Sequence, residues 1–413
     1  MNNPKTDFKI EKIEEEIILP YNIKYQKIKG ATKTNYEGTV AGNKMGEANI
    51  SNDMIDVNKY YSQNIVALTI PHNLDLKFKQ VFKNKNSVWE REHLDILAQE
   101  YEQETGEEVM AIINDDFFDI YRIFPFPGQP DGLVIQNQNN YKTKSYGNHM
   151  SGNLGVDLNN NFVSFSLEES NNLFEKLPKI DILSSNRIKS FLINSINEKP
   201  KQGEIALYFG LPGDDQKVNP KEIEGKGKLY SVKGLILPNG KNDFYGKGKI
   251  TKSTNNILKE DIFFLDSLSE DFNKSIKEGD LVRVQYNLKE EFKDYYAFFG
   301  YKGIVLKNGE FTKMDGNFKI RHPRTIIGIK ENKDVVLVVV DGRRPEQGSY
   351  GVNGLEMAAI MKRLGCVDAY NFDGGGSSAL AIKEKNNFIL KNRPCEGPRK
   401  VINALIITKK VLE

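Results

Sequence analysis

Cysteine is nearly absent from this chain of 413 residues, which contains only Cys366 and Cys395. Two cysteines exclude a disulfide-rich scaffold, although a single bridge between them stays open. Neither has the closely spaced Cys or His companions that a zinc site needs. A long apolar run is also lacking, because the longest purely aliphatic stretch, Val335–Val340, falls far short of the roughly 20 residues that span a bilayer.

An excess of charge of one sign is lacking as well. The 58 Lys and Arg residues nearly balance the 56 Asp and Glu residues, so no global field favours nucleic acid or an anionic membrane. We therefore expect no nucleic-acid partner and no membrane span, and any anion site must be local. The first 20 residues lack the features of a secretory signal, which predicts a cytoplasmic protein, with a place in a virion or export by another route as the alternatives.

Apolar patterning divides the chain into four parts. Residues 1–60 are rich in Asn, Lys and Glu and are expected to form an arm or linker with at most one strand. Residues 61–150 and 311–413 each combine helix and strand patterns and are interpreted as two halves of one domain. Residues 151–310 contain many short strand patterns separated by Gly and Asn, which predict a β-rich elaboration.

The first half contains a helix pattern followed by a strand. A helix is predicted over residues 87–101, with Ser87 and Glu90 at capping-box spacing. The buried strand Val109–Ile113 follows and runs into a polar turn that begins at Asn114.

The second half repeats this order. Asn353 and Glu356 form a capping pair at the start of a helix, and a strand over residues 367–372 runs into Asp373. The two units predict two related halves whose strand ends meet at one cleft. The expected fold is α/β, with mixed sheets and helices packed on them; chance similarity of two common units is the alternative.

Polar residues follow the buried strand Val335–Val340 directly. A continuous aliphatic run is typical of a strand that is covered on both faces, and this one delivers Asp341 and Arg343 to its end. In sheets flanked by helices, ligands commonly bind at that edge.

A second polar turn contains Gly374, Gly375 and Gly376, followed by Ser377 and Ser378. Three consecutive glycines expose backbone N–H groups and permit positive φ, so they can form a nest for an oxyanion. A flexible turn is the alternative. The turn is neither a Walker loop nor a dinucleotide fingerprint, because no Lys follows and the Gly-x-Gly-x-x-Gly spacing is missing.

These motifs together resemble the phosphodiester glycosidase family, which includes the enzyme that removes N-acetylglucosamine from mannose-6-phosphate diesters. The matching segments are His322–Thr325 with Gly328, Val339–Arg343, Gly354–Ala358, Asn371–Ser378, Asn392–Pro394 and Asn403–Leu405, with weaker similarity at Asn114–Phe118 and Gly132–Ile135. Cys395 stands where a Ser is expected, and Asp115 where many relatives carry Gly.

The resemblance implies a hydrolase that cuts a sugar-1-phosphate diester between the anomeric carbon and the phosphate. Such a reaction needs carboxyl groups and neutralisation of the leaving phosphate. The candidate catalytic residues are Asp341, Asp373, Asp116 and His322. The candidate substrate and phosphate ligands are Arg324, Arg343, Gly374, Gly375, Gly376, Ser377, Ser378, Asn392, Arg393 and Asn114.

Several alternatives remain open at this level. Asp341 and Asp373 are interpreted as the catalytic pair, and a gap of about 5 Å would favour retention whereas about 6.5–9.5 Å would favour inversion. No cofactor is expected, with a divalent metal between Asp116 and Asp373 as the alternative. The substrate is a sugar phosphate or a phosphate-containing glycan, such as a teichoic-type polymer. A non-catalytic module that binds anionic glycans, part of a phage or surface assembly, is the competing function.

Overall fold

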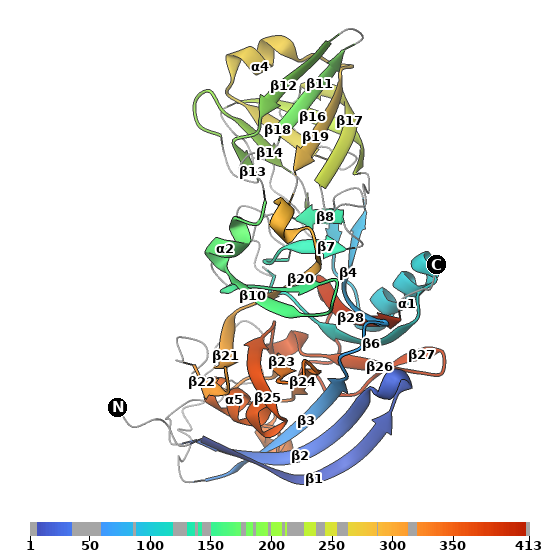
Figure 1. The fold of residues 1–413 in the computed structure, drawn as a ribbon, viewed down its shortest axis with the longest axis vertical. Helices are drawn as coiled ribbons and strands as arrows, with labels where there is room; N and C mark the ends of the chain where they lie inside the picture. The colour runs from blue at the N-terminus through green and yellow to red at the C-terminus, as the bar shows by residue number, and fades with distance from the viewer. Residues whose placement is uncertain are drawn as a thin grey trace.

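The computed structural model describes residues 6–34, 59–85, 88–118, 130–136, 139–142, 150–174, 179–184, 187–196, 200–208, 211–212, 227–236, 244–253, 263–286, 288–312 and 320–409. Three large sheets dominate these residues (Figure 1). The first sheet contains, in spatial order, β1 (Thr6–Ile18), β2 (Lys24–Thr34), β3 (Tyr61–Ile70), β24 (Val335–Val340), β23 (Arg324–Lys330), β25 (Cys366–Asn371), β21 (Gly303–Lys307) and β22 (Glu310–Phe311).

A second sheet faces the first and has seven strands. Its order is β15 (Leu211–Pro212), β5 (Val88–Glu90), β4 (Leu76–Lys85), β28 (Asn403–Lys409), β6 (Val109–Asn114), β26 (Leu380–Glu384) and β27 (Asn387–Leu390). Beside it lie the three-stranded sheet β10 (Phe162–Ser166), β9 (Gly152–Asp157), β20 (Tyr295–Tyr301) and the pair β7 (Val134–Gln136), β8 (Asn139–Lys142).

The third sheet is at the top of Figure 1, remote from the first. Its order is β12 (Arg187–Leu192), β11 (Lys179–Ser184), β19 (Leu281–Tyr286), β17 (Phe244–Ser253), β16 (Lys228–Ile236), β18 (Phe263–Ser267), β14 (Ile205–Tyr208) and β13 (Ser195–Ile196). It has its own apolar core, in which Phe272 and Val284 are fully buried.

Helices are short in the part of the chain that the structure describes. The α-helices are α1 (Leu94–Thr105), α2 (Leu167–Asn171), α4 (Glu270–Ser275) and α5 (Gly354–Arg363), and the 3-10 turns are η1 (Pro20–Asn22), η2 (Glu290–Phe292), η4 (Pro345–Gln347) and η5 (Gly375–Ser377). The α/β class predicted from the sequence is therefore wrong. The protein is mainly β, and its strands pair almost entirely in antiparallel fashion, as β24 does with both β3 and β23.

The misinterpretation has a physical cause in β24. Leu337 belongs to the core between the first and second sheets, whereas Val336 and Val338 belong to the core between the first sheet and α5. A second sheet on one face and a helix on the other bury an antiparallel strand as completely as two helix layers bury a parallel one. The aliphatic run therefore predicts that the strand is buried, but it does not determine whether a helix or a second sheet covers each face.

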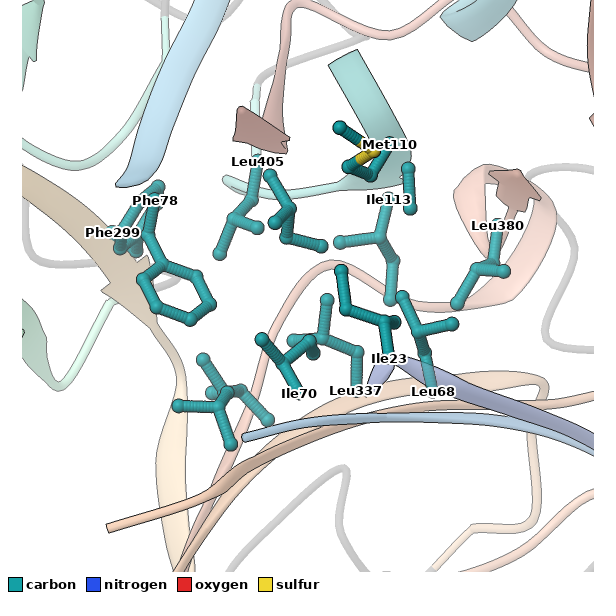
Figure 2. Close-up of a cluster of buried hydrophobic side chains, with 14 of the residues drawn as sticks. Ile23, Leu68, Ile70, Phe78, Met110, Ile113, Phe299, Leu337, Leu380 and Leu405 are labelled. Atoms are coloured by element: carbon teal, nitrogen blue, oxygen red, sulfur yellow. The ribbon is translucent and has the colours of Figure 1, made fainter. Parts of the chain in front are cut away.

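The core between the two facing sheets positions the site (Figure 2). Leu68 and Leu337 of the first sheet face Met110, Ile113 and Leu405 of the second. All of them are at most 3% exposed, and each buried side chain of this size stabilises the fold by about 1.5–3 kcal/mol. This packing fixes the ends of β6 and β25 relative to each other.

Local predictions have mixed outcomes. The Asn353–Glu356 capping box of α5 is confirmed, with both reciprocal hydrogen bonds at 3.0 Å. The predicted start of the first helix is wrong, because residues 88–90 form strand β5 and α1 begins at Leu94 without a side-chain cap; Ser87 lies outside the described residues. The segment interpreted as an arm supplies β1 and β2 to the first sheet.

Candidate active site

The ends of β6 and β25 meet at the site. The side chain of Asn114 donates to the carbonyl of Asp373 over 2.7 Å, and the amide of Asp373 donates to the carbonyl of Asp115 over 2.9 Å. Asn114 Oδ1 also accepts from Thr325 and from Ala379 N, at 2.8 and 3.0 Å. Asn114, predicted as a substrate ligand, is thus a buried clamp between the two sheets.

The three glycines after β25 admit close neighbours. Gly374 lies against the backbone of Pro323, so that an added Cβ would be 2.9 Å from the Pro323 carbonyl oxygen. Gly375 has a φ of +64°, and a Cβ there would be 2.9 Å from Nη2 of Arg343. A Cβ at Gly376 would overlap the guanidinium of Arg399. We call residues 373–378 the glycine loop; it places two guanidinium groups directly on its surface.

Arg343 and Arg399 are connected by one carboxylate. Glu396 Oε2 is 2.7 Å from Nη2 of Arg399, and its Oε1 is 3.4 Å from Nη1 of Arg343. Arg343 has a positive φ of 59° and also approaches Nδ1 of His322, at 3.2 Å from Nη2 and 3.3 Å from Nε. Because an arginine is protonated at neutral pH, His322 Nδ1 must act as the acceptor in these contacts.

Burial controls the charge of His322. Desolvation, assisted by the charges of Arg324 and Arg343, lowers the pKa of His322 to about 2. The imidazole is therefore neutral at physiological pH. Its position beside Arg343 suits an orienting role better than the role of a proton donor.

Arg324 lies beneath the glycine loop and is 6% exposed. Its Nε donates to the carbonyl of Val352 over 3.2 Å and its Nη2 to the carbonyl of Ile320 over 2.8 Å. Burial and the charge of Arg343 lower its pKa to about 10. Arg324 thus supports the loop with positive charge from within the protein, whereas Arg343 and Arg399 lie on the outer side.

Asp373 is a partly buried carboxyl at the start of the glycine loop. Desolvation raises its pKa to about 6, against the opposing effects of a hydrogen bond from Ser377 and the charge of Arg399. Lys302 lies within its electrostatic reach, and burial together with Arg324 lowers the pKa of this lysine. A carboxyl that titrates near neutrality next to cationic groups is a good candidate for proton transfer.

Asp341 has a different environment from Asp373, although the sequence suggested a pair. Its Oδ1 accepts from Nδ2 of Asn392 over 3.0 Å, and both carboxyl oxygens accept from the backbone N–H of Arg393 over 3.1 Å. Desolvation raises its pKa to about 6, opposed mainly by these bonds and then by Arg344. The groups that influence Asp341 differ from those that influence Asp373.

Asp116 is 2% exposed and lies inside the protein. Its Oδ2 accepts from Asn403 Nδ2 over 2.7 Å, and its backbone N–H donates to Asn403 Oδ1 over 3.0 Å. Gly132 and Gly300 pack so closely on Oδ1 that a Cβ at either would overlap it. These contacts favour a structural role for Asp116, locking β28 to the end of β6.

The side chains of the remaining predicted ligands differ in how accessible they are to a substrate. Ser377 and Ser378 are at most 2% exposed, so their hydroxyls lie behind the backbone of the loop. Asn392 uses its whole amide internally, since Nδ2 donates to Asp341 and to the Ser378 carbonyl and Oδ1 accepts from Leu380 N, each at 3.0 Å. Arg393 has an exposed side chain.

The residues of this site that the sequence did not predict include two cations, Arg399 and Lys302. Arg399 lies between the Asn392–Pro394 and Asn403–Leu405 motifs, and this position alone could have indicated from the sequence that Arg399 belongs to the site. Lys302 is the single residue between β20 and β21, and no motif marks it. Both were missed because their relation to Asp373 is set by the tertiary structure.

The described residues contain neither a cluster suited to a metal ion nor a disulfide. Within the described ranges, no group of three or more His, Cys, Asp or Glu side chains is arranged to hold a metal ion. Cys366 and Cys395 are free thiols, so the single bridge that the sequence left open does not form. Among the same residues, none of the helices has the length and apolarity needed to cross a membrane.

Comparison with known proteins bears on the segment that carries the glycine loop. Residues 226–408 match the phosphodiester glycosidase family. The resemblance inferred from the motifs is thereby confirmed, and both Asp341 and the glycine loop lie within the matched residues. The phosphodiester glycosidase match stops short of the N-terminal strands β1 to β6.

Individual relatives add information on the fold. The SPbeta prophage-derived uncharacterized protein YomE of Bacillus subtilis is 35% identical over 69 residues, and the match spans 17% of this chain and 10% of that protein. A putative exported protein from Burkholderia pseudomallei has a TM-score of 0.57 at 12% identity, over 98% of this chain and 97% of its own. A hypothetical protein from Synechocystis has a TM-score of 0.53 at 14% identity, over 98% and 81%. At these identities the two structures show a shared fold.

Proposed function

We propose that this protein hydrolyses sugar-1-phosphate diesters by cutting the bond between the anomeric carbon and the phosphate oxygen. The observation that carries the proposal is the glycine loop, on which Arg343 and Arg399 lie next to Asp373. The phosphodiester glycosidase match over residues 226–408 supports the same reaction.

In this proposal the phosphate binds between Arg343 and Arg399. A guanidinium can hold two phosphate oxygens at once, and each charge-assisted hydrogen bond contributes roughly 1.5–3 kcal/mol. The Glu396 carboxylate bridges the two arginines, which supports an oxyanion site between them that a phosphate would take over from Glu396. His322 accepts from Arg343 and thereby holds its guanidinium toward the loop. Two guanidinium groups neutralise the leaving phosphate without a metal or other cofactor.

Asp373 performs the proton transfer in this proposal. Its carboxylate takes a proton from a water molecule as that water attacks the anomeric carbon. The C–O bond to the phosphate breaks at the same time, and the phosphomonoester leaves with the bonding electrons. A phosphate is a good leaving group and needs little acid assistance. One carboxylate acting on water predicts inversion at the anomeric carbon.

Product release from defined diesters tests the proposal. Nucleoside-diphosphate sugars and hexose-1-phosphate diesters would be incubated with wild type, Asp373→Asn, Arg343→Ala and Arg399→Ala. Free sugar would be measured together with the other product, a nucleoside diphosphate from the former and a phosphomonoester from the latter. We expect release by wild type, loss with Asp373→Asn, and a large decrease with either arginine variant. Arg363→Ala is the matched control, because Arg363 is an exposed arginine at the end of α5, and EDTA is expected to leave activity unchanged.

The opposite results would favour the competing function. Binding of the diesters without any release of sugar by the folded wild type would indicate a module that binds anionic glycans. Full activity of Asp373→Asn would remove Asp373 from the reaction. Loss of activity with EDTA that added divalent metal restores would contradict the metal-free reaction.

A further inference from the structure

A polar cavity of about 300 Å³ lies on the other side of the segment that carries Arg343. We call it the Asp341 pocket. The lining residues used here are Lys27, Asn64, Asp341, Arg344, Asn392 and Arg393. They come from β2, from β3, from the turn after β24 and from the chain after β27, so the N-terminal strands complete a wall that the phosphodiester glycosidase match leaves out.

The Asp341 pocket and the glycine loop share a wall. Arg343 approaches Sγ of Cys395 at 3.9 Å with its Nη1, while Arg344 donates to the carbonyl of the same residue, at 3.2 Å from Nε and 2.5 Å from Nη2. The consecutive residues Arg343 and Arg344 thus both contact the turn at Cys395. Arg343 lies on the glycine loop, and Arg344 lines the pocket. A ligand bound at one site has a second polar recess next to it.

Cations in the Asp341 pocket are available to a ligand. The Arg344 bonds given above go to backbone carbonyls, and its charge favours the ionised form of Asp341 in the same pocket. Lys27 pairs with Glu14 at 3.6 Å, but the two side chains are 45% and 35% exposed, so the pair is weak and screened by solvent. Arg393 adds a third cation with an exposed side chain. These three cations suit an anion that remains partly hydrated when it is bound.

Neutral and acidic groups of the pocket suit hydroxyls. Asp341 is held by Asn392 and by the backbone of Arg393, which fix the carboxyl in one orientation. The three bonds from Asn392 and Arg393 leave about one acceptor site, on Oδ2, for a donor from the cavity side, since a carboxylate can accept about four hydrogen bonds. Asn64, held by Ser349 at 3.3 Å, contributes a further amide. A sugar phosphate needs acceptors for its hydroxyl groups and cations for its phosphate group, and the pocket provides both.

We propose that the Asp341 pocket binds a second sugar-phosphate unit, the neighbour of the unit that is cleaved at the glycine loop. The inference rests on the proposed function and names its substrate class: an anionic glycan of repeating sugar phosphates, with at least two units bound at once. The cavity volume lies at the lower end of the range of about 300–1,000 Å³ for ligand pockets, which suits one such unit. Asp341 then acts in binding, and Asp373 in the reaction.

Equilibrium binding to the full chain tests this inference without turnover. The Asp373→Asn protein would be titrated calorimetrically with a single hexose 1-phosphate and with two hexose phosphate units joined by a phosphodiester. We expect the two-unit ligand to bind at least tenfold more tightly. Adding Lys27→Gln should reduce this gap severalfold, because it removes a cation from the pocket, whereas Arg399→Ala should weaken both ligands alike.

Lys29→Gln is the matched control. Lys29 lies on the same face of β2 two residues further on, is exposed, and does not line the pocket, so the gap should persist in this variant. Equal affinity of the two ligands, or an equal effect of Lys27→Gln on both, would overturn the second-unit site. A persistent gap in a protein that hydrolyses no diester would instead refute the proposed reaction and leave the pocket assignment standing.

Discussion

The guanidinium of Arg399 lies against Gly376, in the space that a side chain at that position would occupy. A Cβ at Gly374 would instead lie 2.9 Å from the backbone carbonyl oxygen of Pro323, which is less close than a Cβ at Gly376 would lie to Nη2 of Arg399. A guanidinium at the end of a flexible side chain can move aside, whereas a backbone carbonyl in a packed strand start cannot. The two glycines therefore have separable roles.

Substitution of these glycines should separate binding from stability. Gly376→Ala should displace Arg399 and raise KM for a diester about tenfold, the loss of one charge-assisted contact, with a near-normal Tm. Gly374→Ala should lower the free energy of unfolding by about 1–3 kcal/mol, the usual cost of overpacking. Steady-state kinetics and urea unfolding of both variants check this, and a normal KM for Gly376→Ala would contradict the assigned place of Arg399.

The pH dependence of the reaction should report Asp373. Burial raises its pKa to about 6, and the proposed reaction needs its ionised form. The value of kcat/KM should therefore rise with pH up to about 6, tenfold per pH unit at the acidic end, and level off above. Residual activity of Asp373→Asn should lack this rise. A kcat/KM that falls as pH increases through 6 would instead assign Asp373 to proton donation.

Burial of Asp341 should appear in the pH dependence of stability. Its folded-state pKa of about 6 lies above the ordinary value of about 3.9, so the folded state binds the proton more tightly than the unfolded state. The free energy of unfolding should fall as pH rises from about 4 to about 6. Asp341→Asn should flatten this decrease in urea titrations at a series of pH values; an unchanged slope would show that other groups cause it.

His322 should remain neutral across the working range of pH. Desolvation and two neighbouring arginines lower its pKa to about 2. In nitrogen-resolved NMR spectra of the imidazoles, the His322 resonance should not shift between about pH 5 and 8, whereas a solvated histidine titrates near 6.5. Arg343→Ala removes one of the two charges and should raise the His322 pKa. A His322 titration near 6.5 in wild type would contradict the tight contact with Arg343.

Glu356 should be a residue of stability and not of catalysis. Its side chain is fully buried, bonds to Arg321 over 2.8 Å and caps α5. Glu356→Gln leaves the buried Arg321 charge without its partner, which typically costs 3–5 kcal/mol. Urea unfolding should show this loss, while kcat of the folded fraction stays near normal.

The control for Glu356 is an exposed pair in helix α4. Glu270 and Lys274 are 3.0 Å apart, with side chains 83% and 76% exposed, and Glu270→Gln should cost well under about 1 kcal/mol. A strong decrease of kcat in folded Glu356→Gln would contradict the structural role.

The sequence by itself determined local features whose causes lie within a few residues. The aliphatic run from Val335 to Val340 specified a buried strand, and the Asn353–Glu356 spacing specified the start of α5. The order of the motifs also specified the phosphodiester glycosidase resemblance. In each case a short pattern has one favourable backbone solution.

Only the tertiary structure decided how these features pack together. The apolar pattern of β24 predicts that the strand is buried but does not indicate what covers it. The pattern therefore could not predict the antiparallel pairing of β24, and the α/β class inferred from it was wrong. The sequence predicted that the strand ends at Asn114 and Asp373 meet, as they do. Packing of the two sheets in addition turns Asp341 toward the N-terminal strands and places Arg399 on Gly376. Contacts between residues far apart in the chain depend on the summed packing of both sheets, which no local pattern encodes.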